Sequence, residues 1–383
     1  MSVKQTEYVV ATAADREEIV DFANYVFSQA HEPHDFKTLL PKAYADHLPE
    51  LGAKHFLAKQ EGRIRALVAL RPLELRVPGS LLKVGCVGTV SVHPYSRGEG
   101  HMKKLMAMML EDAAAQGYDL LMLGGIRQRY NYFGFEQAGW AYRYHIAESA
   151  VRHALGGVDA EGIAFSALTE DRPEEIDFAC ALAAKRLMTG VRPRDRFLDI
   201  MHSWHSDCRL IRVDGEMAGF IMGRGGDGEG GEITLAREAD LPRVIKALFE
   251  KDGVKRLEIA CGAHETERIA ILADICSGRS IGSVEMINVL NWPRTLEALL
   301  RLRAGFMPLE DGAFTIAVGD EPSVTIRVEG GAPRAAEEGL EPDLRLDHLT
   351  ALRRLFGLEA FALGSAYKNW FPLPFFVSPA DTF

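Results

Sequence analysis

Several features that mark common classes of protein are missing from this sequence. No stretch approaches the roughly 20 apolar residues of a membrane span, and the first residues carry no apolar signal region. The five cysteines never form a Cys-x-x-Cys pair, which indicates free thiols in a reducing compartment and no metal site. The formal net charge is −10, so the chain has no excess of cationic residues for binding the phosphates of a nucleic acid. We therefore expect a cytoplasmic protein without a metal, a membrane or a nucleic-acid partner.

The composition is that of a globular protein with more than one core. Hydrophobic residues make up 47% and charged residues 26% of the 383 residues. A chain of this length is too long for one typical core, so we expect two or three domains.

The most informative local pattern is a glycine-containing turn between a strand and a helix. Residues 90–92 predict the end of a strand, and apolar residues at helical spacing from Met102 predict the helix. Gly98 and Gly100 allow the main chain to approach a ligand closely, Arg97 adds a positive charge, and the first turn of a helix attracts anions. The run lacks the Gly-Lys-Ser/Thr of a P-loop. It is compatible both with anion binding and with an ordinary tight connection.

The pattern Val-x-Val-x-Pro-x-x-Arg-x-x-Gly over residues 90–100 resembles the acetyl-coenzyme A loop of the GNAT superfamily of N-acetyltransferases. In that superfamily the strand before the loop separates from its neighbour, and its free main-chain groups bind the pantetheine arm. The resemblance implies acetyl-coenzyme A as co-substrate. It also implies that the following residues contact it: Val90, Ser91, Val92, Arg97, Gly98, Glu99, Gly100, His101, Met102, Lys103, Gly125 and Ile126.

The order of predicted elements along the chain indicates an α/β (α+β) protein with an internal repeat. A hairpin, a strand, a helix and a further strand follow one another in the first region, and the same order returns between residues 208 and 260. In the second copy Glu238 and Asp240 stand at the start of the helix, where they should repel a pyrophosphate. A third region of two strands and two helices begins near Trp292, and the apolar segment 367–377 must pack against something.

Three such regions resemble the enhanced-intracellular-survival (Eis-type) acetyltransferases over the whole chain. The resemblance implies tandem GNAT folds, the second degenerate, followed by a domain like the sterol carrier protein. The implied domains are residues 1–150, which are catalytic, residues 151–290, which are the degenerate copy, and residues 291–383. A homo-oligomer, specifically a hexamer, is implied as well.

Two catalytic residues follow from the same resemblance. The segment 129–135 resembles the family's Tyr-x-x-Phe-Gly-aromatic motif, which makes Tyr130 the general acid. The family places its C-terminus in the active site, which makes the α-carboxylate of Phe383 the general base. The alternative is that Tyr130 is a packing aromatic and that Phe383 fills an apolar groove.

The predicted reaction is direct transfer of an acetyl group from acetyl-coenzyme A to a primary amine. An alkyl amine has a pKa near 10, so a base must take its proton, and a phenol can protonate the leaving thiolate. The sequence does not identify the amine, and the family suggests aminoglycosides, polyamines or lysine side chains, in a small molecule or a peptide. The alternatives are a non-enzymatic carrier of an apolar ligand and a protein lysine acetyltransferase.

Overall fold

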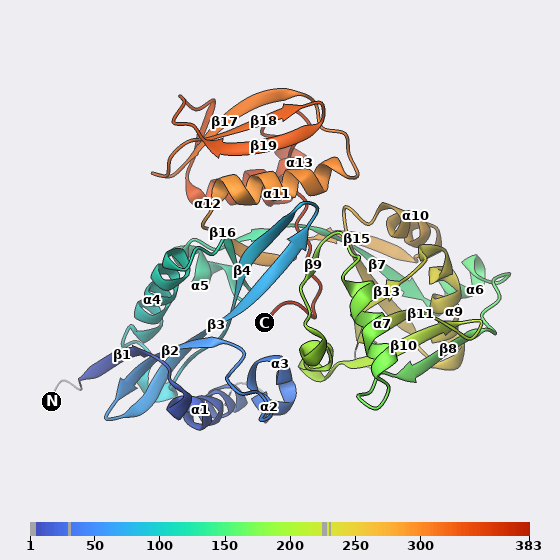
Figure 1. The fold of residues 1–383 in the computed structure, drawn as a ribbon, viewed down its shortest axis with the longest axis horizontal. Helices are drawn as coiled ribbons and strands as arrows, with labels where there is room; N and C mark the ends of the chain where they lie inside the picture. Colours follow the sequence, from blue (N-terminus) through green and yellow to red (C-terminus); the bar gives the residue numbers. More distant parts are fainter. Residues whose placement is uncertain (1–4, 30–31, 224–227, 230) are drawn as a thin grey trace.

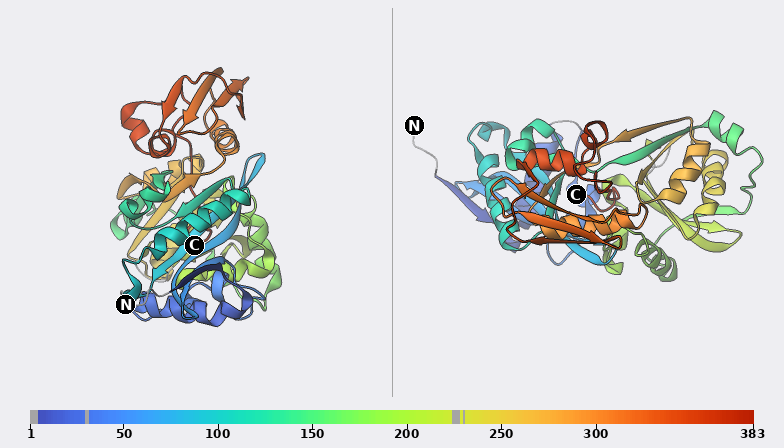
Figure 2. Two further views of the ribbon diagram at one scale, coloured as in Figure 1. Left: turned by 90° about the vertical axis from the view of Figure 1, so that its left-hand side faces the viewer. Right: turned by 90° about the horizontal axis from the view of Figure 1, so that it is seen from above.

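The computed structural model describes residues 5–29, 32–223, 228–229 and 231–383. They form three units, and Figure 1 shows the first two side by side with the third packed at one end above the first. The turned views in Figure 2 show the same stacking of the third unit over the sheet of the first. The C-terminus lies in the middle of the molecule, between the first two units (Figure 1).

The first unit is built on an eight-stranded sheet. Seven strands follow the order β1-β2-β3-β4-β5-β16-β6, and β9 pairs with the outer part of β3. The helix α4 packs on one face through Leu105, Met106 and Met109, as its predicted apolar stripe requires. The strands are β1 (Thr6–Val10), β2 (Lys54–Gln60), β3 (Arg63–Val77), β4 (Ser80–Val92), β5 (Leu120–Leu123), β6 (Glu136–Ala138), β9 (Thr189–Gly190) and β16 (Glu285–Val289). The helices are α1 (Arg16–Ser28), α2 (Phe36–Leu39), α3 (Pro41–Tyr44), α4 (His101–Ala115) and α5 (Arg127–Tyr130).

Two strands are exchanged between the first and second units. The strand β16 follows the second unit in the chain, yet it lies between β5 and β6 in the first sheet. Conversely, β7 (Ala141–Ala147) follows β6 directly but pairs with β14 and β15 of the second unit. The domain boundaries at residues 150 and 290 stay a prediction. Each of the first two units contributes a strand to a sheet of the other.

The second unit contains two four-stranded sheets, β13-β11-β10-β8 and β12-β14-β7-β15. The pair Asp214-Gly215 is a sequence signal for a hairpin turn, and the structure confirms the turn between β10 and β11, with positive φ at both residues. The glycine-rich sequence at 223–231 predicts a loop, most of which lies outside the described residues. The strands are β8 (Ile163–Ala167), β10 (Asp207–Val213), β11 (Glu216–Gly223), β12 (Gly228–Glu229), β13 (Glu232–Leu235), β14 (Arg256–Gly262) and β15 (Gly278–Gly282). The helices are α6 (Glu148–Ala154), α7 (Pro173–Ala183), α8 (Phe197–Met201), α9 (Leu241–Lys251) and α10 (Thr266–Ile275).

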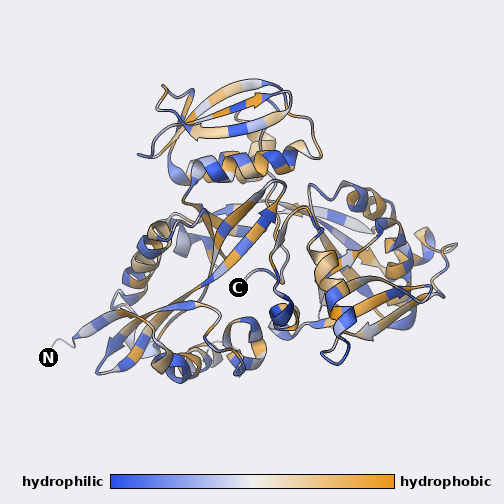
Figure 3. Ribbon diagram, in the orientation of Figure 1, coloured by the Kyte–Doolittle hydropathy of each residue, from blue (hydrophilic) through white to orange (hydrophobic). Residues whose placement is uncertain are grey.

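The third unit is a four-stranded sheet, β19-β18-β17-β20, with helices on one side. Hydrophobic and hydrophilic residues alternate along α11 in Figure 3, and its apolar side joins the largest core cluster of the protein. The strands are β17 (Gly312–Val318), β18 (Val324–Glu329), β19 (Ala332–Glu337) and β20 (Leu344–Leu346). The helices are α11 (Trp292–Ala304), α12 (His348–Phe356) and α13 (Glu359–Leu363).

The apolar C-terminal segment is buried, as predicted. Trp370, Phe371, Leu373 and Phe375 join the core cluster that links the third unit to the first sheet. From there the chain runs down between the first two units to Phe383 (Figure 1). We call residues 370–383 the C-terminal tail.

Candidate active site

The strands β4 and β5 separate halfway along the sheet. They pair in parallel only from Val84 with Leu120 to Val87 with Leu123. Beyond that point β4 continues to Val92 beside β3, while the chain leaves β5 at Gly124. The result is a gap that begins between Gly88 and Gly124. Among the described residues, no strand fills this gap by pairing with the edge of β4 that faces it. We call it the strand gap.

A β-bulge directs main-chain groups of β4 toward this gap. The pairing with β3 shifts between Gly88 and Ser91, and Thr89 takes a positive φ of 48°. The Tyr44 hydroxyl lies 2.7 Å from Thr89 Oγ1 and anchors the bulge. The N–H of His93 donates to the C=O of Arg65 in β3. Because hydrogen-bonded and non-hydrogen-bonded positions alternate along an antiparallel strand, Val92 is a position that forms no main-chain hydrogen bonds to β3. The N–H and C=O of Val92 therefore point away from β3, toward the gap.

The loop after β4 has the conformation that its glycines predict. Gly98 and Gly100 have φ values of 87° and 83°, and a Cβ atom at either position would meet nothing within 4 Å. Gly100 is the N-cap of α4, whose first main-chain N–H groups face outward at the open side of the loop. An open glycine loop in front of a helix N-terminus fits a pyrophosphate.

The side chains predicted to contact acetyl-coenzyme A divide into two sets. Arg97 and Lys103 are exposed, and Lys103 lies over the Tyr132 ring at 4.2 Å. The His101 side chain is buried and lies 3.0 Å from the Tyr8 hydroxyl, and Met102 packs against the core. His101 and Met102 can therefore face a ligand only through main-chain groups. Of the remaining positions, Glu99, Gly125 and Ile126 are exposed, Val90 is half-buried against the core, and Ser91 is buried.

Tyr130 lies on the α4 face of the sheet, beside the gap. It ends α5, and its ring packs so closely on Gly125 that a Cβ there would lie 2.9 Å from Tyr130 Cε2. Val87 and Leu123, the last paired residues of β4 and β5, belong to the same core cluster. Burial raises the pKa of Tyr130, although Arg129 opposes this effect. The phenol consequently stays protonated at neutral pH.

Phe383 lies on the opposite face of the sheet, at the same gap. A Cβ atom at Gly88 would collide with the Phe383 ring, so only glycine fits there. Gly88 is two residues from Cys86 in β4, so the two residues face the same side of the sheet. The tail lies on that side, since Cys86 Sγ is 3.6 Å from the main-chain oxygen of Asp381. Tyr130 and Phe383 thus border the strand gap from its two sides.

A buried ionic network anchors the C-terminal tail to the second unit. The guanidinium of Arg192 donates to both carboxylates, at 2.7 Å to Asp381 and 2.6 Å to Glu232. Glu232 also accepts from the hydroxyl of Ser378, and Arg186 lies 3.0 Å from it. These cations hold the pKa of Glu232 well below its usual range in spite of burial. The network fixes the tail two residues before Phe383.

Trp204 of the second unit contacts the last residue directly. Its indole Nε1 donates to the main-chain oxygen of Phe383 at 2.9 Å. Trp204 and His205 both have positive φ, at 62° and 54°, which is costly for residues with a Cβ. The spacing His202-x-x-His205 favours surface or packing histidines over a metal site, and the residue between the two histidines makes the contact with Phe383. Among the described residues, no three His, Cys, Asp or Glu side chains gather as a metal site would require.

Glu285 is a second acidic residue at the gap that sequence reasoning missed. It begins the exchanged strand β16, and its Oε2 would lie 3.3 Å from a Cβ at Gly124. Burial raises the pKa of Glu285 to about 7. No local pattern could have found it, because the pairing that places it beside Gly124 joins segments about 160 residues apart in the sequence.

The raised pKa of Glu285 makes the stability of the protein depend on pH. The folded state holds a proton up to about pH 7, whereas the unfolded chain releases it near 4.5, so the free energy of unfolding falls between these values. The loss amounts to about 3 kcal/mol. Glu285→Gln cannot ionise, so its stability relative to wild type should rise by this amount from pH 4.5 to 7.5 in urea unfolding. A difference that stays constant with pH would contradict the assignment.

The corresponding turn of the second unit has the acidic character predicted for it. Glu238 and Asp240 precede α9, where Glu238 pairs with Arg268 at 2.6 Å and Asp240 with Arg237 at 3.1 Å. The carboxylates occupy the place where a phosphate would have to approach the helix.

The comparisons with known proteins agree with this geometry. Residues 7–138 match the family model described as an acetyltransferase (GNAT) domain. No curated protein matches the sequence. Among the helices of the described residues, none is long and apolar enough to cross a membrane.

Several solved structures share the fold over nearly the whole chain. A GCN5-related N-acetyltransferase from Anabaena variabilis has a TM-score of 0.70 at 13% identity, covering 99% of this chain and 100% of that one. One from Kribbella flavida has a TM-score of 0.65 at 14% identity, covering 94% and 92%. Eis1 from Mycobacterium abscessus has a TM-score of 0.63 at 17% identity, covering 98% and 95%. At these identities the likeness establishes the fold, and the family match establishes that residues 7–138 form an acetyltransferase domain of the GNAT type.

Proposed function

We propose that this chain is an N-acetyltransferase of the Eis type, which moves an acetyl group from acetyl-coenzyme A to a primary amine. Acetyl-coenzyme A supplies the activated acetyl thioester. The observation that carries the proposal is the placement of Tyr130 and Phe383 on opposite faces of one strand gap. A thioester in that gap would have the Tyr130 phenol on one side and, on the other, Phe383, whose ring lies at Gly88 and whose main-chain oxygen accepts from Trp204.

Each residue at the gap then has a chemical role. The α-carboxylate of Phe383 accepts the proton of the attacking amine, and its charge attracts the cationic form of the substrate. The N–H of Val92 polarises the thioester carbonyl. Tyr130, which its raised pKa keeps protonated at neutral pH, protonates the leaving thiolate. The helix N-terminus at Gly100, with Arg97, binds the pyrophosphate.

The carrier alternative receives less support. An apolar ligand would need the inner face of the β17–β20 sheet, yet that face packs against α11, α12 and the tail residues Trp370 and Phe371. Tandem GNAT folds and a third domain like the sterol carrier protein remain part of the proposal, on the resemblance and the repeated order of elements.

The test of the function identifies the product. Wild-type protein would be incubated with acetyl-coenzyme A and, separately, with a polyamine, an aminoglycoside and a lysine peptide, and the products measured by mass spectrometry. A gain of one or more acetyl groups on the small amines supports the proposal. Acetylation confined to lysine peptides supports the protein acetyltransferase instead, and no product on any amine contradicts both.

Trp204 gives a separate prediction about the base. Trp204→Phe keeps an aromatic ring but loses the N–H that holds the Phe383 oxygen, so we expect kcat to fall about 10-fold with little change in the KM for acetyl-coenzyme A. Trp140→Phe is the matched control, because its buried indole nitrogen has no hydrogen-bond partner among the described residues. Equal rates in the two variants would contradict a role of Trp204 in positioning the carboxylate.

A further inference from the structure

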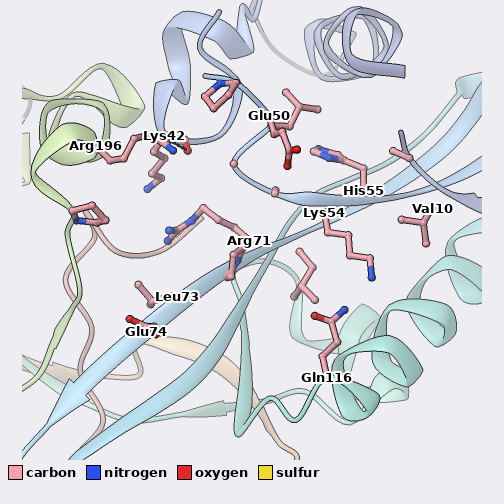
Figure 4. A pocket seen from close by; sticks show the side chains of 18 of the residues that line it. Val10, Lys42, Glu50, Lys54, His55, Arg71, Leu73, Glu74, Gln116 and Arg196 are labelled. Carbon is pink, nitrogen blue, oxygen red and sulfur yellow. Dashed lines mark hydrogen bonds between the residues drawn. The ribbon is translucent and has the colours of Figure 1, made fainter. Parts of the chain in front are cut away.

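A cavity lies behind the candidate active site, along the free edge of β3. Its volume is about 980 Å³. On this edge β3 pairs with β2 up to Leu70 and with β9 from Leu75, which leaves the stretch between them open apart from a bond from Val191 to Glu74. Residues 49–55 of the first unit and 191–200 of the second form the walls (Figure 4). The cavity is therefore on the opposite edge of the β3–β4 ribbon from the strand gap.

The lining of this cavity is cationic, although the whole chain carries a net charge of −10. Six cationic and two acidic side chains, Glu50 and Glu74, line it. Two of the cations are paired with carboxylates outside the lining, Lys54 with Asp112 and Arg196 with Asp199, which leaves four cations against the two acids. An excess of one sign in a concave site with protein walls concentrates ions of the other sign. The six cationic residues are Arg16, Lys42, Lys54, Arg71, Lys83 and Arg196.

Lys42 and Arg71 are the two cations without a counter-charge at the deep end. Their exposed fractions are 2% and 8%. Lys42 Nζ donates to the main-chain oxygens of Ala380 at 3.1 Å and Thr382 at 2.6 Å, and Arg71 Nη2 donates to that of Thr382 at 3.2 Å. Neither forms an ion pair with a carboxylate of the described residues. The nearby carboxylate of Asp381 is bound by Arg192 instead.

The two cations also act on each other. Figure 4 shows their charged ends pointing toward one another at one side of the cavity. Burial, and then the charge of Arg71, lower the pKa of Lys42 to about 7. The Nε–H of Arg71 is buried and has no hydrogen-bond partner among the described residues. Buried like charges with an unused donor are costly unless an anion compensates them.

We propose that this cavity is a binding site for a small anion that carries phosphoryl or carboxylate oxygens. Such oxygens accept from a guanidinium and an ammonium at once, and bound anion would neutralise both deep cations. Because Lys42 and Arg71 hold the main chain of residues 380–382, the anion would also stabilise the C-terminal tail next to Phe383. The site is independent of the acetyl-coenzyme A loop, and the inference stands whether or not the proposed acetyl transfer is correct.

The test measures anion binding to the full chain. Inorganic phosphate and, separately, citrate would be titrated calorimetrically at constant ionic strength, with chloride as the reference ion. We expect saturable binding of one of them below about 10 mM, and at least 10-fold weaker binding in Lys42→Met. Lys255→Gln removes the same charge from the exposed surface of the second unit and should bind as wild type does. Excess acetyl-coenzyme A should not displace the anion.

Two further variants keep the test decisive if Lys42→Met fails to fold. Lys83→Gln at the cavity wall should weaken binding, whereas Glu50→Gln removes a lining acid and should strengthen it. The proposal is overturned if neither anion binds more tightly than chloride, or if affinity is unaltered in Lys42→Met, or if it fails to move in opposite directions in Lys83→Gln and Glu50→Gln.

Discussion

Tyr130→Phe should lower kcat by about 100-fold or more while the KM for acetyl-coenzyme A changes little, since general acid catalysis contributes about 10²–10⁴-fold. The substitution removes only the hydroxyl and leaves the ring packed against Gly125. Steady-state rates of thiol release would measure the effect. Without the phenol, the thiolate must leave unprotonated or take its proton from water.

Tyr132→Phe is the matched control for this prediction. Tyr132 is two residues away and 70% exposed, and it lies under Lys103 rather than in the gap. Its variant should keep nearly the full rate. Comparable losses in both variants would show that the segment contributes to packing or cofactor binding instead of proton donation by Tyr130.

Moving the α-carboxylate away from the gap should have an effect of similar size. A chain extended beyond Phe383 by a few residues keeps the ring but replaces the carboxylate by a neutral peptide group, which cannot accept a proton at neutral pH. We expect kcat to fall by about 100-fold or more. Thiol release would again be measured, with binding of acetyl-coenzyme A checked independently.

The control for the extension adds the same residues before Met1, since the first described strand, β1, lies away from the C-terminus in Figure 1. The tail is held by Arg192 and Lys42 upstream of Phe383, so its path should survive the change. An extended chain with the wild-type rate would remove the carboxylate from the mechanism and would favour Phe383 as a packing residue.

The parts of the fold that could be predicted are those in which local signals agree. The turn at Asp214 and Gly215, the stripe of α4 and the glycine loop before it depend on residues that are neighbours in the chain. Taken alone, the alternation of apolar and polar residues over 73–77 predicts a separate strand. These residues continue β3, because its pairing with β4 runs without a break from Ala69 to Val77.

The parts that could not be predicted depend on contacts between distant segments. Glu285 reaches Gly124 only because β16 is exchanged into the first sheet, and the chain around it carries no signal of this exchange. Trp204 meets Phe383 across 179 positions of the sequence. Lys42 lies in the short helix α3 and Arg71 in β3, and only the path of the tail reveals that both bind its main-chain oxygens and lack a carboxylate partner among the described residues. Tyr130 and Phe383 could be named from a family motif, while their placement on opposite faces of one gap required the structure.

The most direct test of the central claim is thiol release from acetyl-coenzyme A with a panel of amines, compared among wild type, Tyr130→Phe and the chain extended beyond Phe383. The account predicts amine-dependent turnover in wild type and a loss of about 100-fold in each variant, with acetyl-coenzyme A still bound. Turnover that is absent in wild type, or unaffected by both changes, would contradict the assignment of these two groups as acid and base.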